Sequence, residues 1–286
     1  MKIGFLGTGL MGAPMVRRLA AAGHELVVWN RSRDKAEALE DCALVAKDAA
    51  GVASGADLTI SMLMDGPATR DVLSRQGVIE EAIRGATIID MASVDPATDR
   101  DLAAVCAERG LAFLDAPVSG GVVGAEEGTL SIFVGGSAET FERARTILAA
   151  MGRPTHLGPV GSGQVTKLAN QMIVAGTIGA VAEGLRLAEA GGCSPPDVRQ
   201  ALMGGFADSR ILDLHGQRMV DGNYEPGGRS VAQLKDLNNA LDEAALHDLS
   251  LPVAETVQAA FRDFVVHHDG ADLDHSAYHH WLKVKR

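Results

Sequence analysis

Hydrophobic and polar positions divide the first half of the chain into short apolar runs that alternate with longer amphipathic stretches. The runs are rich in residues that favour strands, and the stretches between them have the three- to four-residue spacing of helices. The predicted strands lie at residues 3–6, 26–29, 58–62, 87–90, 112–114 and 130–134. Strands that alternate with helices predict a doubly wound α/β domain, in which helices cover both faces of a mostly parallel sheet.

The second half of the chain has a different pattern. Strand signals stop near Leu157, and the glycine-rich segment 158–163 marks a boundary. A long apolar helix is predicted from about Gln164 to Ala190, and shorter helices follow it, broken at proline and glycine pairs. We therefore predict two domains, an α/β domain at residues 1–162 and an all-α domain at residues 163–286, joined by the long helix.

A glycine pattern follows the first predicted strand. Residues 3–6 run directly into Gly7-Thr8-Gly9-Leu10-Met11-Gly12, and an amphipathic helix begins at Ala13. The first glycine permits a tight turn, the second lets the backbone approach a pyrophosphate, and the third lets the helix lie close to the strand. Free N–H groups at the helix N-terminus favour the negative charge of the pyrophosphate. The first domain is therefore predicted to be a Rossmann domain that binds a dinucleotide through residues 7–12.

The end of the second strand distinguishes the two nicotinamide cofactors. An NAD(H) site usually has Asp or Glu there, to accept hydrogen bonds from the ribose hydroxyls. This chain has Asn30-Arg31-Ser32, with Arg33 directly behind. A guanidinium can bind a 2′-phosphate through two charge-assisted hydrogen bonds, so we expect NADP(H) rather than NAD(H). The alternative is a polar turn with a solvated arginine.

Three later segments follow strand ends and are candidates to line one cleft: residues 62–64, Ala92-Ser93 and residues 116–121. In a parallel sheet, ligands bind beyond the carboxyl ends of the strands. Within Asp115–Gly121, the Ser119 hydroxyl and the N–H groups of Gly120 and Gly121 could hold a substrate carboxylate. The alternative for this segment is an ordinary Gly-Gly turn.

Lys167 is the candidate acid in the first turns of the long helix. A lysine on a helix is usually a solvated surface residue. This one follows a glycine-rich loop at a domain junction, in an otherwise apolar helix, with Asn170 and Gln171 one turn later. A protonated lysine can supply the proton that an oxygen needs when hydride reaches the adjoining carbon, and its charge stabilises the developing oxyanion.

Other chemistries are disfavoured. The adjacent pairs His267-His268 and His279-His280 diverge on a helix, so we expect no metal site. Asp274-His275-Ser276 contains the residue types of a hydrolase triad, but sequence neighbours rarely meet in triad geometry.

Charge and cysteine content narrow the class of protein. The formal net charge of the 286 residues is −11, which argues against binding nucleic acid or an anionic membrane surface. Three scattered cysteines suit a reducing cytoplasm, and the apolar stretch 168–182 is short for a membrane span.

Four segments in this order, Gly7–Gly12, Asp115–Gly121, the glycine-bounded segment around Lys167 and Lys235-Asp236-Leu237, resemble the β-hydroxyacid dehydrogenases. The resemblance covers essentially the whole chain. It implies a Rossmann domain, a long linking helix and an all-α domain for substrate binding and oligomerisation, through which a homodimer or homotetramer forms.

The resemblance also implies roles for individual residues. Lys167 matches the catalytic acid/base, Ser119, Gly120 and Gly121 match the groups that hold the substrate carboxylate, and Asn170 and Gln171 match the family's amide positions. Ser93 and Lys235 match cofactor contacts. Leu63-Met64 stands where the family usually has Leu-Pro, and Asn30-Arg31 replaces the acidic residue of NAD-using members.

The implied activity is the NADPH-dependent reduction of a small carboxylate-bearing aldehyde to the hydroxyacid. Segments 165–171, 201–207 and 274–277 most resemble the family members that convert tartronate semialdehyde to glycerate. The alternatives are 3-hydroxyisobutyrate oxidation and the reduction of succinic semialdehyde or glyoxylate. An alternative of another class is a non-catalytic NADP-binding sensor, which would have no need of Lys167.

Overall fold

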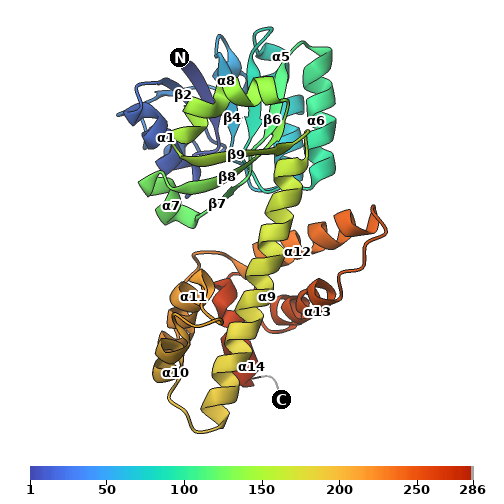
Figure 1. Ribbon diagram of the computed structural model, residues 1–286. Coiled ribbons are helices and arrows are strands. Elements are labelled where there is room, and N and C mark those ends of the chain that lie inside the picture. Colours follow the sequence, from blue (N-terminus) through green and yellow to red (C-terminus); the bar gives the residue numbers. More distant parts are fainter. Residues whose placement is uncertain (285–286) are drawn as a thin grey trace. The chain divides into compact units, whose positions relative to one another are not determined.

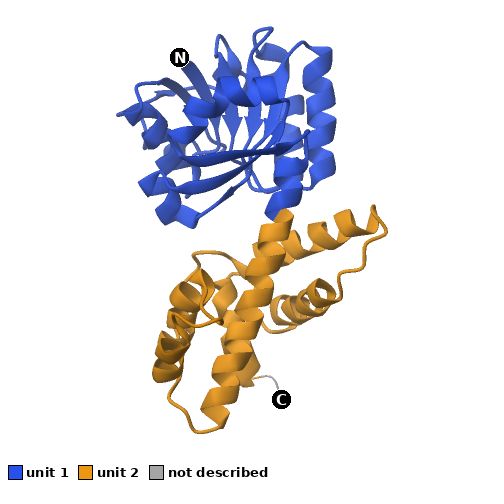
Figure 2. Ribbon diagram, in the orientation of Figure 1, with its two compact units in different colours: residues 1–167 blue, residues 168–286 orange. Residues whose placement is uncertain are grey.

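The computed structural model describes residues 1–284, and the chain divides into two compact units, Met1–Lys167 and the segment from Leu168 onward (Figure 2). The first unit is α/β and the second contains helices only, which confirms the predicted fold class. The helix α9 (Ser162–Ala190) begins in the first unit and continues into the second.

The sheet of the first unit is parallel through six strands and then changes direction. In spatial order the parallel strands are β3 (Leu44–Val45), β2 (Glu25–Trp29), β1 (Lys2–Leu6), β4 (Leu58–Ser61), β5 (Thr87–Asp90) and β6 (Ala112–Asp115). β8 (Leu130–Gly136) pairs antiparallel with β6 and with β7 (Val118–Ser119), and β9 (Gly152–Gly158) pairs parallel with β8.

Two hydrophobic clusters cover the two faces of this sheet, because successive side chains of a strand point to opposite faces. Ile89 and Leu114 join one cluster, whereas their neighbours Ile88 and Phe113 join the other. The first cluster includes α1 (Gly12–Ala21) and α8 (Ala138–Ala149), and the second includes α3 (Ala50–Ala53), α5 (Val78–Glu81) and α6 (Pro96–Glu108). Figure 1 shows these helices around the sheet. Shorter elements connect them: α2 (Arg33–Glu37), α4 (Gly66–Arg70), the π-helix η1 (Asp71–Arg75) and α7 (Gly121–Glu127).

The second unit packs short helices around α9 (Figure 1). These helices are α10 (Pro195–Leu202), α11 (Arg210–Asp221), α12 (Ser230–Ala245), α13 (Pro252–His267), the 3₁₀ turn η2 (His275–Ala277) and α14 (Tyr278–Val284). α10 and α13 begin at prolines, which suit the first turn because a proline has no N–H to leave unpaired there.

α9 is the one helix within residues 1–284 that is long and apolar enough to cross a membrane by length and composition. Its residues Ala175, Ile178, Ala182 and Leu185 belong to the buried core of the second unit. Their spacing of three or four residues places them on one face of the helix, which is how a core helix packs.

Candidate functional site

The first unit aligns four strand ends at one edge of its sheet. Leu6 of β1, Ser61 of β4, Asp90 of β5 and Asp115 of β6 are paired in register, one after another. The segments that follow these residues therefore emerge side by side at the carboxyl edge, where α/β sheets bind ligands. These segments contain the predicted cofactor and substrate residues of the first unit except Asn30, Arg31 and Ser32, which follow β2.

The glycine loop between β1 and α1 has the geometry that its spacing predicts. Gly7 has a φ of +94°, and a Cβ there would lie 2.4 Å from the carbonyl oxygen of Met62. A Cβ at Gly12 would lie 1.9 Å from the carbonyl oxygen of Gly7, so only glycine permits this approach of helix and strand. A Cβ at Gly9 would meet nothing within 4 Å. Gly9 therefore borders open space, as a residue that a pyrophosphate approaches must.

The start of α1 fits an anionic ligand. Met11, at its N-cap, provides no side-chain hydrogen bond to the first turn, and no acidic residue lies in that turn. The Thr8 hydroxyl is buried without a hydrogen-bond partner among the described residues. Free N–H groups at a helix N-terminus bind phosphate groups well. Within the glycine loop, Leu10 is exposed, whereas Gly7 and Thr8 are buried.

Asn30 connects the glycine loop to the end of β2. Its Oδ1 accepts a hydrogen bond from the Thr8 N–H at 3.1 Å, and its Nδ2 donates to the carbonyl oxygen of Ser32 at 2.9 Å. Asn30 thus fixes the position of the glycine loop. This role is separate from its predicted contact with the cofactor.

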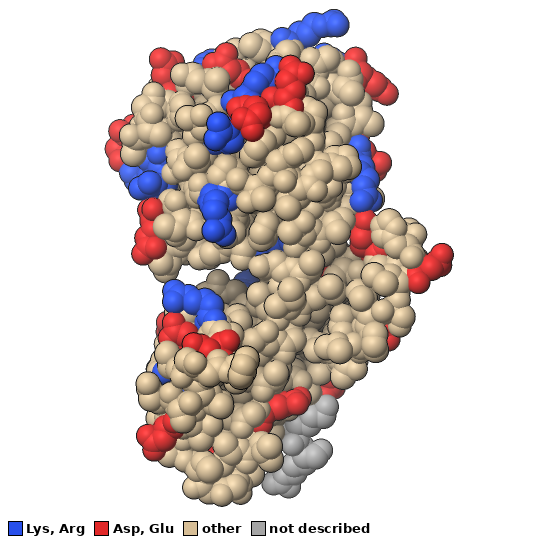
Figure 3. All heavy atoms as spheres, viewed as in Figure 1, with Lys and Arg blue, Asp and Glu red and all other residues tan. Residues whose placement is uncertain are grey.

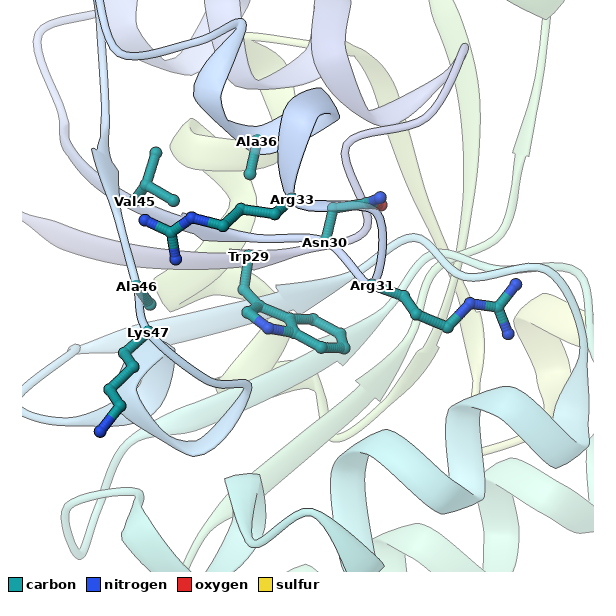
Figure 4. Close-up of a pocket in the computed structure, with 8 residues that line it drawn as sticks. All are labelled: Trp29, Asn30, Arg31, Arg33, Ala36, Val45, Ala46 and Lys47. Carbon is teal, nitrogen blue, oxygen red and sulfur yellow. The ribbon is translucent and has the colours of Figure 1, made fainter.

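A pocket of about 120 Å³ lies beside the ends of β2 and β3 (Figure 4). Arg33 and Lys47 point to one side of the Trp29 indole, and Arg31 points to the other. The guanidinium of Arg33 forms an ion pair with Glu37 at 2.7 Å. Arg31, Ser32 and Lys47 are exposed. The pocket thus brings three cations near a stacking surface, a combination that suits an adenosine carrying a 2′-phosphate.

The remaining predicted cofactor residues of this unit also follow strand ends. Leu63 packs against the core cluster beside Gly7, whereas Met64 is 72% exposed. Ser93 is half-buried just beyond β5.

The predicted substrate cradle lies at the end of β7. Ser119 is half-buried, and Gly120 and Gly121 are exposed with φ values of +138° and +64°. Two successive positive φ values are readily accessible only to glycine. A Cβ at Gly121 would meet nothing within 4 Å, so its N–H lies at an open surface that a small anion can reach.

Three buried aspartates, which we call the acid cluster, lie behind this edge: Asp90, Asp99 and Asp115. Burial raises the pKa of Asp90 to about 7, although hydrogen bonds from Ser61 and Ala92 act in the opposite direction. Burial and the charges of Asp90 and Asp115 hold the pKa of Asp99 well above its usual range. Because burial disfavours the charged form, both carboxyl groups favour their protonated state relative to a carboxyl group in water.

The acid cluster fastens the start of α9. The Asp115 carboxylate accepts hydrogen bonds from the N–H groups of Gly161 and Gln164 at 2.8 and 2.9 Å. The Gln164 amide donates to Asp99 and to the carbonyl oxygen of Ala92, both at 2.8 Å, and accepts from the N–H of Val94. Gln164 is fully buried, and this network fixes the first turn of α9 to the ends of β5 and β6.

Lys167 lies one turn after Gln164 on α9. Its side chain is only 8% exposed, which is unusual for lysine. A buried ammonium must be stabilised by polar groups around it. The fixed first turn therefore holds a buried amine at a defined position along the helix.

In the second unit, Asn170, Gln171, Asp236 and Lys235 form a chain of polar contacts. Asn170 donates from Nδ2 to the Oε1 of Gln171, and Gln171 donates from Nε2 to Asp236, both at 2.8 Å. The other carboxylate oxygen of Asp236 lies 3.2 Å from the ammonium nitrogen of Lys235. Asp236 is buried, so this carboxylate orients both a predicted substrate amide and a predicted cofactor lysine.

Asp274 and Ser276 have a capping arrangement. The Ser276 hydroxyl and N–H both donate to Asp274, at 2.6 and 3.0 Å, and both residues are fully buried. Asp274 caps the turn η2, and Ser276 donates its hydroxyl hydrogen to that carboxylate and is not poised as a nucleophile.

Sequence reasoning missed several of these polar residues. Gln164, Asp99 and Asp236 gain their roles from partners 65 residues away in sequence. Lys47 reaches the pocket of Trp29 because β3 pairs with β2. A possible signal was the position of Asp90 and Asp115 as the last residues of apolar strands, where an unpaired acid needs an explanation.

Figure 3 shows the distribution of charged side chains over one face of the molecule. Basic and acidic side chains are interspersed over this face in both units. A nucleic-acid site would need a basic stripe.

Comparisons with known proteins agree with this geometry. Residues 2–179 match the family model described as the NAD binding domain of 6-phosphogluconate dehydrogenase, and residues 161–282 match that of NADP-dependent 3-hydroxyisobutyrate dehydrogenase. The chain is 43% identical to the 2-hydroxy-3-oxopropionate reductase of Escherichia coli, over 97% of this chain and 95% of the relative.

Solved structures give the same result for the fold. The 3-hydroxyisobutyrate dehydrogenase of Mycobacterium tuberculosis, solved with L-serine, is similar with a TM-score of 0.90 at 31% identity over 99% of both chains. Psf3, solved with NADP+ and 2-OPP, is similar with a TM-score of 0.88 at 26% identity, over 98% of this chain and 99% of that one.

Proposed function

The chain belongs to the β-hydroxyacid dehydrogenase family of NAD(P)-dependent oxidoreductases, and we propose that it reduces a small carboxylate-bearing aldehyde to the hydroxyacid with NADPH. The preferred substrate is tartronate semialdehyde, which becomes glycerate. The observation that supports the chemistry best is the buried amine of Lys167, held one turn beyond the acid cluster.

Lys167 is the proposed proton donor. When bound, the nicotinamide cofactor supplies hydride to the carbonyl carbon. Lys167 then gives its proton to the carbonyl oxygen, and before that its charge stabilises the negative charge growing on this atom. In the direction of oxidation, the neutral amine accepts the hydroxyl proton.

The other assigned residues bind and orient. Ser119 and the N–H groups of Gly120 and Gly121 hold the substrate carboxylate. Asn170 and Gln171 donate hydrogen bonds to the substrate, and Asp236 keeps the Gln171 amide in one orientation. Lys235 is assigned to cofactor binding. Asp236 is a positioning residue, since it acts through the two side chains that it holds.

The cofactor assignment rests on the glycine loop and the pocket beside Trp29. The loop of residues 7–12 and the α1 N-terminus bind the pyrophosphate. Arg31, with Arg33 and Lys47 nearby, binds the 2′-phosphate, so NADP(H) is favoured over NAD(H). Asn30, Ser32, Leu63, Met64 and Ser93 border the same ligand.

The assignment of tartronate semialdehyde is supported by the relative from Escherichia coli, whose name refers to that substrate under its other name. The alternative substrates are 3-hydroxyisobutyrate, after the second family model, and succinic semialdehyde or glyoxylate. A single methylene in a pocket changes selectivity by only about 1–3 kcal/mol, so close homologues can differ in substrate.

A substrate panel tests the proposal. Tartronate semialdehyde, succinic semialdehyde and glyoxylate are assayed for reduction, and glycerate, 3-hydroxyisobutyrate and serine for oxidation, each with both nicotinamide cofactors. We expect the highest kcat/KM for tartronate semialdehyde with NADPH. A higher value for another acid reassigns the substrate, and no turnover with any of them favours the non-catalytic sensor.

The same family assignment supports a proposal for the cellular setting and the assembly. We propose a cytoplasmic enzyme that forms a homodimer or homotetramer through its helical unit. Ile173 and Leu187 of α9 are 69% and 77% exposed in the single chain, and large apolar side chains of this kind are often covered by a neighbouring subunit.

A further inference from the structure

A pair of histidines in the second unit lies outside the proposed catalytic set. His215 is on α11 and His275 begins η2, 60 residues later. Their Nε2 atoms lie 3.3 Å apart, and the rings meet edge-on with centroids separated by 4.5 Å. Neither ring is fully buried, so small solutes can reach the pair.

The other nitrogen of each ring, Nδ1, lies close to an oxygen atom of a neighbouring side chain. The Nδ1 of His215 lies 3.5 Å from a carboxylate oxygen of Asp274, and the Nδ1 of His275 lies 3.3 Å from the Oε1 of Gln233. The Gln233 amide has a defined orientation, because its Nε2 donates to the carbonyl oxygen of Gln171 at 3.1 Å. The Nδ1 of His275 therefore has a hydrogen-bond partner in Gln233, and the Nδ1 of His215 faces the Asp274 carboxylate at ion-pair distance.

The two Nε2 atoms are hydrogen-bonded to one another, so one ring donates and the other accepts. A neutral imidazole with its hydrogen on Nδ1 has a lone pair on Nε2, which is the usual state of a metal-bound histidine. A metal ion that replaces the shared hydrogen would be bound by both Nε2 lone pairs. Two nitrogens bound to Zn²⁺ at about 2.0–2.1 Å with tetrahedral angles are separated by about 3.3–3.4 Å, which matches the observed distance.

Asp274 is placed to orient the His215 ring and not to bind the metal ion itself. One potential ligand atom from each of His215, Asp274 and His275 lies within 4.8 Å of the others. Asp274 nevertheless uses both its oxygens, because it accepts from the N–H groups of Gly227 and Gly228 and from Ser276. A carboxylate that holds a metal-binding histidine by its Nδ1–H raises the basicity of that histidine.

We propose that His215 and His275 form a binding site for a divalent metal ion such as Zn²⁺, Ni²⁺ or Cu²⁺, with Asp274 and Gln233 as partners that orient the two rings. Imidazole ligands suit Zn²⁺, Ni²⁺ and Cu²⁺ and do not suit Mg²⁺ or Ca²⁺. The guanidinium of Arg218, 3.5 Å from Asp274, adds a positive charge nearby that opposes any cation held only by charge. The two nitrogens are therefore the source of affinity, and water completes the coordination.

The site was not visible in the sequence. The histidine pairs that stand out there, His267-His268 and His279-His280, are adjacent residues. His215 and His275 come together only because α11 packs against η2. His279 is held instead in the core, where burial lowers its pKa to about 4 and Tyr224 lies 3.2 Å from its Nδ1.

Metal titration of the full chain tests the proposal. The protein is treated with a chelator, dialysed, and titrated with Zn²⁺ or Ni²⁺ in competition with a chromogenic indicator. We expect one site that is weakened at least about tenfold in His215→Ala and in His275→Ala. His247→Ala removes an exposed histidine on another segment and should leave that site unchanged. Mg²⁺ should not compete.

A second measurement covers variants that fold poorly. Zn²⁺ should raise the Tm of the unaltered protein, because a ligand that binds only the folded state stabilises it. His275→Asn keeps a polar side chain of moderate size without the Nε2 lone pair, and should abolish this shift while its Tm without metal stays close to normal. An unchanged Zn²⁺ affinity in His215→Ala and His275→Asn, or an equal effect of Mg²⁺, would overturn the proposal.

Discussion

Charged groups lie in opposite environments at two places along the carboxyl edge of the sheet in the first unit. At one place they are buried, and at the other they are exposed. Beyond β5 and β6, the acid cluster places three carboxyl groups in the interior, with Ser61, Gln164 and backbone N–H groups as hydrogen-bond partners. Beyond β2 and β3, the cations Arg31, Arg33 and Lys47 lie at the surface around an indole. Both regions follow strand ends, yet one contains acids that hold protons and the other contains hydrated bases.

The difference shows what burial does to a charged group. Removing a carboxylate from water costs more than its hydrogen bonds return, so the pKa rises and the group holds a proton. The acid cluster, in which burial favours protonation, fastens the start of α9 through hydrogen bonds. A guanidinium at the surface keeps its hydration and its charge, and can offer both to a phosphate group.

The largest predicted effect is at Lys167, the buried lysine that follows Gln164 by one turn of α9. Lys167→Ala should lower kcat by at least about a hundredfold, because the proton donor is lost, while cofactor affinity stays nearly unchanged. Steady-state kinetics and cofactor fluorescence titration measure the two quantities.

Lys35→Ala is a suitable control for this variant, since it removes an exposed lysine on α2. Near-normal turnover in Lys167→Ala would show that the buried amine is not the proton donor, and the contrast with the surface cations would lose its functional meaning.

The second prediction concerns the proton of the acid cluster. The folded pKa of Asp90, about 7, lies above the unfolded value of about 4. The folded chain then holds more protons between these values, so stability is fully present below pH 4 and declines as pH rises towards 7. Asp90→Asn removes this titration. The fall in Tm between pH 5 and 8 should therefore be a few degrees smaller in this variant than in the unaltered protein.

Thermal unfolding at several pH values measures this effect. Asp101→Asn changes an exposed aspartate of the same helix as Asp99, and its pH dependence should match that of the unaltered protein. A profile in Asp90→Asn that is as steep as that of the unaltered protein would mean that the acid cluster is ionised, like the groups at the surface.

The smallest predicted effect is at the exposed end of the edge. Arg31→Ala should weaken NADPH binding about tenfold, the value of a partly solvated charge-assisted hydrogen bond, and should change NADH binding little. Arg33→Ala should have a smaller effect, because Glu37 already pairs with that guanidinium. Binding titrations with both cofactors measure the ratio, and equal losses for NADPH and NADH would remove the 2′-phosphate assignment.

The sequence predicted the parts of the fold that depend on local patterns. The apolar runs located β1, β2, β4, β5, β6 and β8 but not the two-residue strand β3. The predicted helix from Gln164 to Ala190 corresponds to α9, Ser162–Ala190. It did not predict β9, because Gly152–Gly158 contains a proline and alternates half-buried with exposed residues. The antiparallel pairing of β8 with β6 was also missed, since pairing direction depends on the route of the chain in space.

The site divides in the same way. The glycine loop could be predicted because each glycine has a local steric reason, and the positions of Gly7 and Gly12 satisfy that reason. The partners of Gln164, and the meeting of His215 with His275, depend on tertiary packing between distant segments. No local pattern contains that information.

The unbroken course of α9 has a consequence for how this chain can change in evolution. Lys167 and Gln171 are four positions apart, so they lie on one face of the helix. A residue inserted or deleted between them would turn one against the other by about 100°. We therefore expect insertions and deletions in loops such as 203–209, and only substitutions in the segment 164–171.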